Sequence, residues 1–261
     1  MVKSLILSAI FMALTVLPAF ASEVHWSYKG DTGPEYWGCL NEEFGKAIGS
    51  AQSPIDVQMG RVEQTGGAKL GIHYVDGAFS VLNNGHTIQM APEVKNESYI
   101  TLDGEKHYLQ QFHFHVPSEH HINGVTLPME LHFVNKSDAG KLAVVALLFK
   151  EGGSYSNSKG DGSNKILAPA WENMPTERNA TARIAKFAIT KLLPAKLTNI
   201  QYSGSLTTPP TAEGVSWIIL DERAYAADAQ FKKFNTVIGD NARPVQPLND
   251  RRLYLSSGVR Q

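Results

Sequence analysis

Short runs of apolar, β-branched and aromatic residues bounded by turn residues recur along the chain, and they predict a protein built mainly from strands. The clearest runs are YITL at 99–102, YLQQFHFHV at 108–116, MELHFV at 129–134, LAVVALLF at 142–149 and VSWIIL at 215–220. The run at 142–149 is apolar on both faces, which is typical of a central strand.

Helical signals are few and short. One lies at 168–174, and a second, DERAYAADAQFKKF at 221–234, has Asp221 as its expected cap. No internal repeat and no linker divides the chain. The stretch GGSYSNSKGDGSNK at 152–165 predicts a long flexible surface loop, and it lacks the spaced acids and closing glutamate of a calcium loop.

The first residues are typical of a targeting signal. Lys3 precedes an almost wholly apolar run at 4–18 and the small-residue cleavage pattern at 19–21. A retained membrane anchor is disfavoured, because the run is short for a span and no stop-transfer pattern follows. We expect a signal peptide at 1–21, a mature domain at 22–261, and a periplasmic or secreted protein.

Composition and charge limit the kinds of partner that the protein can bind. The 261 residues carry a formal net charge of −1 and a pI near 6.8, so no basic stripe points to nucleic acid, and small or neutral partners fit best. Cys39 is the only cysteine. It therefore has no partner within its own chain, although export leads to an oxidising compartment.

The segment QFHFHVPSEH at 111–120 carries the first candidate chemistry. Because residues two apart share a strand face, His113 and His115 project together, whereas Phe112 and Phe114 point into a core. Two such histidines alone are more often a half-buried edge or a hydrogen-bonded pair than metal ligands.

His132, in the run at 129–134, strengthens the case for a metal. An antiparallel strand reached through the turn at 123–124 would bring a third imidazole onto the same face. Three neutral histidines with an open fourth position are the arrangement of catalytic zinc. Gln111 and Glu130, each two residues before a histidine, are placed to accept from the second ring nitrogens, although either one alone would be read as an exposed side chain.

Five motifs together resemble those of alpha-class carbonic anhydrases, and they are GPEYW at 33–37, LNNGH at 82–86, QFHFHVPSEH at 111–120, MELHF at 129–133 and SLTTPP at 205–210. The similarity extends from about Trp26 to about Leu253. It implies a single domain of mixed α/β class, mainly β, with a large twisted, mostly antiparallel central sheet and short surface helices. It also implies reversible hydration of carbon dioxide to bicarbonate and a proton by attack of zinc-bound hydroxide, which forms near pH 7 as is long established for this enzyme class. Esterase activity would be a side reaction.

The resemblance also implies roles for single residues. Zinc would be bound by three histidines, His113, His115 and His132. Thr207 would accept a hydrogen bond from the hydroxide and donate one to Glu119, which aims the attacking lone pair. Thr208 would contact bicarbonate or inhibitors. Taken alone, this segment is simply a proline-terminated turn.

The same resemblance implies two walls of a cleft. An apolar wall would accept carbon dioxide and would consist of Val134, Val144, Leu206, Val215 and Trp217. A polar wall would order water and would include Tyr28, Asn83 and Gln89. His86 would carry the proton to buffer, because histidine titrates near neutrality, although a lone loop histidine is usually just solvated. Expected partners are carbon dioxide, bicarbonate, and sulfonamide or anion inhibitors, without nucleic acid or a membrane anchor after cleavage, in a monomer or homodimer.

Two other classes of protein fit the sequence less well. A zinc-free binding module of the same fold would have lost ligand histidines, and a zinc peptidase is disfavoured because H-E-x-x-H is absent. The resemblance assigns no role to His25, His73, His107, His120 or His121, and it places Asn241 and Arg243 in a structural segment.

The resemblance also bears on Cys39. Exported members of the family commonly bridge the cysteine of a W-G-C segment to one just after T-T-P-P, where this chain has Thr211. We expect the bridge to be missing and Cys39 to be a buried free thiol, with a link between two chains as the alternative.

Overall fold

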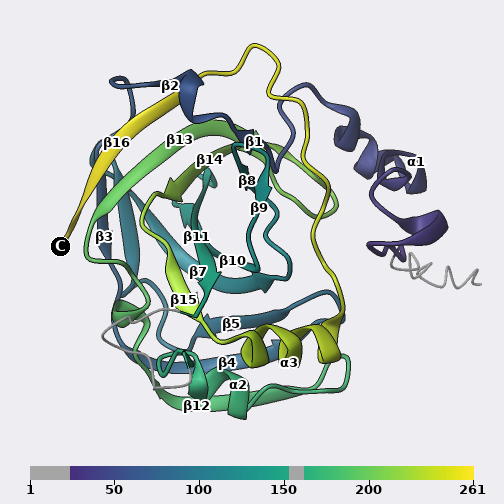
Figure 1. Cartoon of the computed structure of the whole chain (residues 1–261), viewed down its shortest axis with the longest axis vertical. Coiled ribbons are helices and arrows are strands. Elements are labelled where there is room, and N and C mark those ends of the chain that lie inside the picture. The colour runs from purple at the N-terminus through teal and green to yellow at the C-terminus, as the bar shows by residue number, and fades with distance from the viewer. Residues whose placement is uncertain (1–23, 153–161) are drawn as a thin grey trace, which may run out of the picture.

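The computed structural model describes residues 24–152 and 162–261, in which strands dominate (Figure 1). The expected signal peptide and most of the 152–165 loop lie outside the described residues. The strands are β1 (Asp56–Val57), β2 (Val62–Glu63), β3 (Leu70–His73), β4 (Gly77–Asn83), β5 (Ile88–Pro92), β6 (Tyr99–Leu102), β7 (Glu105–His115), β8 (His121–Ile122), β9 (Val125–Thr126), β10 (Met129–Ser137), β11 (Leu142–Glu151), β12 (Thr181–Phe187), β13 (Leu197–Ser205), β14 (Glu213–Leu220), β15 (Ala224–Ala226) and β16 (Leu253–Arg260).

Helices are short and peripheral. The α-helices are α1 (Trp37–Leu40), α2 (Ala168–Glu172) and α3 (Asp228–Ile238), and 3-10 helices lie at Gly30–Thr32, Glu42–Ile48, Met59–Arg61 and Ile189–Lys191. In Figure 1, α1 lies to one side of the sheet, while α2 and α3 lie beside β4 and β12. Within the described ranges, no helix has the length and apolar character needed to cross a membrane.

The strands form one large sheet in the order β10-β11-β14-β13-β16-β3-β6-β7-β5-β4-β12 and a small sheet β1-β8-β9. Because β10 also pairs with β7, the strands from β10 to β7 in this order form a closed ring of hydrogen-bonded neighbours. Most pairings are antiparallel, whereas β11 runs parallel to β14 and β16 parallel to β3. This mainly-β single domain with a large mixed sheet confirms the expected fold class.

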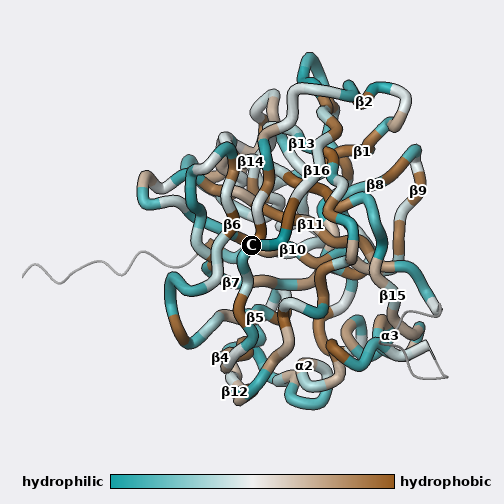
Figure 2. Tube along the Cα trace, turned by 90° about the vertical axis from the view of Figure 1, so that its left-hand side faces the viewer, coloured by the Kyte–Doolittle hydropathy of each residue, from teal (hydrophilic) through white to brown (hydrophobic). Residues whose placement is uncertain are grey.

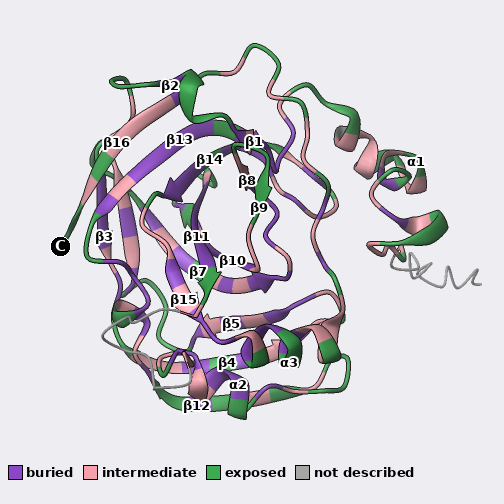
Figure 3. Cartoon of the chain, viewed as in Figure 1, coloured by how far each residue is buried: buried purple, intermediate pink, exposed green. Residues whose placement is uncertain are grey.

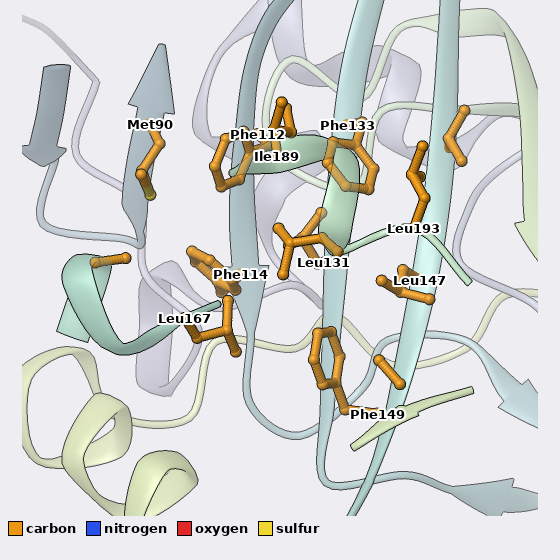
Figure 4. Close-up of a cluster of buried hydrophobic side chains, with 14 of the residues drawn as sticks. Met90, Phe112, Phe114, Leu131, Phe133, Leu147, Phe149, Leu167, Ile189 and Leu193 are labelled. Atoms are coloured by element: carbon orange, nitrogen blue, oxygen red, sulfur yellow. The ribbon is translucent and has the colours of Figure 1, made fainter. Parts of the chain in front are cut away.

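The alternation in β7 sorts its side chains onto two faces. Phe112 and Phe114 are fully buried in one hydrophobic cluster with Leu131 and Phe133 of β10, as Figure 4 shows. Burying a phenylalanine side chain contributes roughly 2–3 kcal/mol relative to leaving it exposed, so these rings hold the register of the β7–β10 pair. The prediction that the aromatic face of this segment enters a core is confirmed.

The run predicted to be a central strand, β11, lies between β10 and β14 and is buried from Ala143 to Phe149 (Figure 3). Val145 and Leu147 join the cluster on one face, whereas Val144, Ala146 and Leu148 join a second cluster on the other. Figure 2 shows the hydrophobic positions concentrated on such inner strands and the hydrophilic ones mainly on outer loops. The second cluster occupies the face that carries the histidines.

Two sequence-based expectations are wrong. The helix expected over 221–234 begins only at Asp228, because the preceding strand β15 pairs with the end of β11 and buries Ala224 and Ala226. This pairing outweighs local helix propensity. Cys39 is exposed rather than buried.

Candidate active site

Three histidines converge where β7 and β10 pair. His113 lies directly opposite His132, and His115 lies opposite Glu130. Each imidazole offers one ring nitrogen, and these three nitrogens lie within 4.8 Å of one another. The antiparallel register expected from the sequence therefore produces one cluster.

The second nitrogen of each ring is held by an acceptor. The pairs are His113 Nδ1 with Gln111 Oε1 at 2.8 Å, His115 Nδ1 with the Asn241 carbonyl oxygen at 2.8 Å, and His132 Nε2 with Glu130 Oε1 at 2.7 Å. These bonds assign the proton to the outer nitrogen of each ring and direct the other lone pair inward. The sequence pointed to Gln111 and Glu130 but not to the Asn241 carbonyl, which comes from a distant segment.

The cluster is suited to a cation. Burial lowers the pKa of His113, His115 and His132, that of His115 to about 4, so the rings are neutral at neutral pH. His115 Nε2 is buried with no hydrogen-bond partner, an arrangement that costs free energy unless a ligand occupies the position. Three neutral imidazoles around an orphaned nitrogen fit Zn²⁺.

Glu130 links the cluster to a buried network. Its Oε2 accepts the backbone N–H groups of Glu119 and His120, and its Oε1 also contacts His120 Nδ1 at 2.6 Å. His120 Nε2 lies 2.7 Å from the Tyr202 hydroxyl. Burial acts to raise the pKa of Glu130, but His120 and His132 outweigh it and hold this pKa well below its usual value. Sequence reasoning gave His120 no role, and no local pattern separates it from an exposed loop histidine.

Glu119 lies beside the cluster, and the ring nitrogens of His113, His115 and His132 that point into the cluster are called the metal-directed nitrogens below. Its Oε2 lies 3.4 Å from His115 Nε2, and its Oε1 accepts the Arg243 backbone N–H at 2.9 Å. Burial raises its pKa to about 7, while the charge of His132 and hydrogen bonds from Thr207 and Arg243 oppose this rise. A cation held by the histidines would favour the ionised carboxylate.

An apolar cavity of about 280 Å³ adjoins the histidines. Its lining includes Val134, Leu142, Val144, Leu206 and Trp217, together with Thr207 and Thr208. Val215 does not line it and is instead buried in the second cluster. Leu142 does line it, although the sequence reasoning did not include this residue.

A polar cavity of about 100 Å³ lies on the other side, and its lining includes Trp26, Tyr28, Asn84, His86 and Gln89. Both cavities share Gln111, His113 and Thr208, so they form one cleft with an apolar and a polar half. Asn83, expected on the polar wall, is instead buried and donates to the Pro175 and Thr176 carbonyls.

The fold and this cleft define a mainly-β metalloenzyme with the three-histidine centre typical of catalytic zinc. Residues 32–257 match the family model of the eukaryotic-type carbonic anhydrases. The chain therefore belongs to the alpha (eukaryotic-type) carbonic anhydrase family, which hydrates carbon dioxide at such a zinc site.

Individual relatives agree with this assignment. A carbonic anhydrase of Klebsiella pneumoniae is 42% identical over 93% of this chain and 96% of its own length, and one of Neisseria gonorrhoeae is 38% identical over 94% of each. The alpha-carbonic anhydrase of Thermovibrio ammonificans, solved with the inhibitor sulfanilamide, superimposes with a TM-score of 0.82 at 41% identity, covering 89% of this chain and 99% of that one. The recognition made from the five motifs is confirmed.

Proposed function

We propose a division of labour among the cleft residues in carbon dioxide hydration. The observation that carries it is the position of three neutral imidazoles where an apolar and a polar cavity meet. Zn²⁺, when bound by His113, His115 and His132, supplies the Lewis acidity that lowers the pKa of water to about 7 in this enzyme class.

Thr207 and Glu119 select the attacking lone pair. When the Thr207 hydroxyl donates to the Glu119 carboxylate, its own oxygen can only accept from the nucleophile. The Arg243 backbone N–H holds the other side of the carboxyl and limits its rotation. The two residues thus orient the nucleophile toward the apolar cavity.

Carbon dioxide occupies the apolar half of the cleft. It carries no charge, so a wall of Val134, Val144, Leu206 and Trp217 can accept it without charged anchors. Thr208, which belongs to both halves, is placed to contact the bicarbonate product or an inhibitor. We expect sulfonamides and small anions to inhibit, and esterase activity to accompany hydration.

His86 carries the proton from the polar half to buffer. Its ring stacks on Trp26 with centroids 3.7 Å apart and planes 8° apart, and both residues line this cavity. Tyr28, Asn84 and Gln89 line the same cavity as His86, His113 and His115, and water in this cavity can form a hydrogen-bonded path. Histidine is suited to this step because it exchanges protons near neutral pH.

Stopped-flow hydration with a pH indicator tests the proposal. Purified protein should hydrate carbon dioxide, lose the activity with a zinc chelator, and regain it with added Zn²⁺. Sulfanilamide should inhibit, and a peptide substrate should remain uncleaved. Zinc-independent hydration, or peptide cleavage without hydration, would contradict the proposal.

His86→Ala tests the shuttle separately. In dilute buffer kcat should fall by roughly ten- to a hundredfold, with a smaller effect on kcat/KM, because proton transfer follows the hydration step. Added imidazole should restore kcat. The matched control is His121→Ala, because His121 bonds to Thr126 outside the cleft. Equal losses in both parameters, without rescue, would exclude His86 as the shuttle.

We also propose that the protein is exported, because of its N-terminal sequence. The apolar run and the Ala19-Phe20-Ala21 pattern support removal of residues 1–21 and a periplasmic or secreted location. Mass spectrometry of protein expressed from the full sequence should give Ser22 as the first residue. A mass that retains the leader would contradict cleavage.

A further inference from the structure

Asn241 connects a metal-directed histidine to the histidine proposed as the proton shuttle. Its backbone oxygen accepts from His115 Nδ1 at 2.8 Å. Its side-chain Nδ2 donates to the carbonyls of His86, at 3.0 Å, and Phe114, at 2.9 Å. Its Oδ1 accepts the Val116 backbone N–H at 2.8 Å, and its own N–H donates to the Val116 carbonyl at 3.1 Å.

The side chain is well fixed in this position. Asn241 is 1% exposed, and every polar atom of its amide has a partner. An amide with this many buried bonds has one orientation, because turning it would face its oxygen toward two carbonyls. The segment of His86 is thereby tied to the end of β7, which carries His115.

Further bonds hold the His86 segment, some local and some to β7. Thr87 Oγ1 donates to the Phe114 carbonyl at 2.6 Å and accepts the Phe114 backbone N–H at 3.2 Å. Asn84 Oδ1 accepts the backbone N–H groups of His86 and Thr87, and Gly85 adopts a φ of +84° next to them. Asn83 ties the start of the segment to the 175–176 carbonyls. At His86 itself, the bond from Asn241 joins the His86 carbonyl to the residue that accepts from His115 Nδ1.

We infer that the Asn241 side chain is a positioning residue for proton transfer, in addition to the contact that its backbone makes with His115. This inference rests on the proposed function, in which His86 is the shuttle. Transfer through ordered water depends steeply on the placement of donor and acceptor, and a misplacement near 1 Å can cost about a hundredfold in rate. Thr87 bonds to Phe114 of the same strand, and Asn241 fixes the carbonyl of His86 itself against the strand of His115, so Asn241 contributes directly to that placement.

The test is a set of four proteins: wild type, Asn241→Ala, His86→Ala and the double variant. In dilute buffer Asn241→Ala should lower kcat by about tenfold, more than it lowers kcat/KM, and imidazole should recover the difference. Zinc content should stay at one per chain, because the backbone carbonyl that accepts from His115 remains. In the His86→Ala background the Asn241 substitution should cause no further loss of kcat, since the two changes act on one step.

Asn199→Ala is the matched control. Asn199 is also fully buried, donates to the Leu197 carbonyl and accepts from Gln201, but it lies on β13 away from the cleft. It should reduce stability without an imidazole-reversible loss of kcat. If Asn241→Ala does not fold, Asn241→Asp keeps the volume and the acceptor for the Val116 N–H while losing both donors, and the same imidazole-reversible loss is expected.

The outcomes separate this inference from the proposed function. If imidazole rescues His86→Ala but not the Asn241 variants, or if kcat of the Asn241 variants is unchanged, the positioning role is overturned and the shuttle stands. If losses in the double variant multiply, Asn241 acts on another step and the inference is equally overturned. If His86→Ala is not rescued, the shuttle itself falls, and the inference falls with it.

Discussion

Each metal-directed histidine is oriented by a different kind of acceptor: a side-chain amide at His113, a backbone carbonyl at His115 and a carboxylate at His132. The carboxylate is the strongest acceptor of the three and increases the basicity of its ring most. The backbone carbonyl is the one that no side-chain substitution can remove. The three ligands are thus unequal at the level of single residues, although they form one site.

Replacement of His115 tests the cluster directly. His115→Ala should abolish stoichiometric zinc and reduce hydration to background, because two histidines cannot complete a tetrahedral site. Elemental analysis of dialysed protein measures the zinc. His107→Ala is the matched control, since His107 is also buried on β7 but bonds to the Glu105 carbonyl outside the cluster. One zinc per chain with full activity in His115→Ala would contradict the assignment.

The metal-free protein should lose stability in acid. The pKa of His115 is lowered from 6.5 to about 4 in the folded state, so its contribution is present above pH 6.5 and lost as pH falls toward 4. For this group alone the loss is about 3 kcal/mol. His113 and His132 act in the same direction, whereas Glu119, with its pKa raised to about 7, opposes them.

Urea unfolding of chelator-treated protein at pH 7.5, 6 and 5 measures this effect. The unfolding midpoint should fall with pH, and His115→Ala should reduce the slope. A constant midpoint would show that Glu119 balances the histidines, and a midpoint that rises on acidification would show that it outweighs them; either result contradicts the prediction.

At the scale of elements, the site depends on how closely β13 and β14 approach the segment before β1. Gly204 of β13 has no space for a side chain, since an added Cβ would overlap Ser53 Oγ and lie 2.8 Å from atoms of both Trp217 and Tyr202. Ser53 and Tyr202 continue the network that leads through His120 to Glu130. A glycine on one strand therefore maintains both the apolar wall and the support of His132.

Gly204→Ala should therefore lower both the stability of the fold and the hydration activity. The added methyl group must displace Trp217, Tyr202 or Ser53, at a cost of roughly 1–3 kcal/mol. Thermal unfolding and hydration assays should both show the loss. Gly77→Ala on β4 is the control, because a Cβ there meets no atom within 4 Å. If the two variants behave alike, the close approach is unimportant.

At the scale of the whole molecule, the closed strand path restrains the fold without a disulfide. β16, the last strand, pairs with β3 and β13, so the C-terminal segment is held between the early and middle parts of the chain. Cys39 is exposed, and Thr211 is buried with a φ of +53°, which is rare for a β-branched residue. A cross-link between these positions would add a restraint that the chain now lacks.

Thr211→Cys tests that restraint. Expressed with export, the variant should form a bridge to Cys39 and melt at a higher temperature, because closing so long a loop restricts the unfolded chain by up to about 5 kcal/mol. Reductant should remove the gain. Native wild-type protein should show one reactive thiol and the variant none. Two titratable thiols in the variant would show that the positions are not adjacent, and a reductant-sensitive wild-type dimer would instead assign Cys39 to a link between chains.

The local pattern of the sequence was sufficient for features that depend on periodicity. It predicted the faces of β7, with His113 and His115 on one side and Phe112 on the other, because a strand alternates whatever its neighbours are. It also predicted the double-sided burial of β11, because only a covered strand is apolar at every position. The five motifs, in their order along the chain, identified the family, and the family in turn implied the reaction.

The tertiary structure decided whatever depends on a partner distant in sequence. Asn241 lies far along the chain from His115 and contacts it only because the segment after α3 passes the end of β7. The burial of His120, the strand β15 in place of a helical turn, and the exposure of Cys39 have the same origin. Hydrogen bonds and burial across such separations depend on the packed fold, so local periodicity does not predict them.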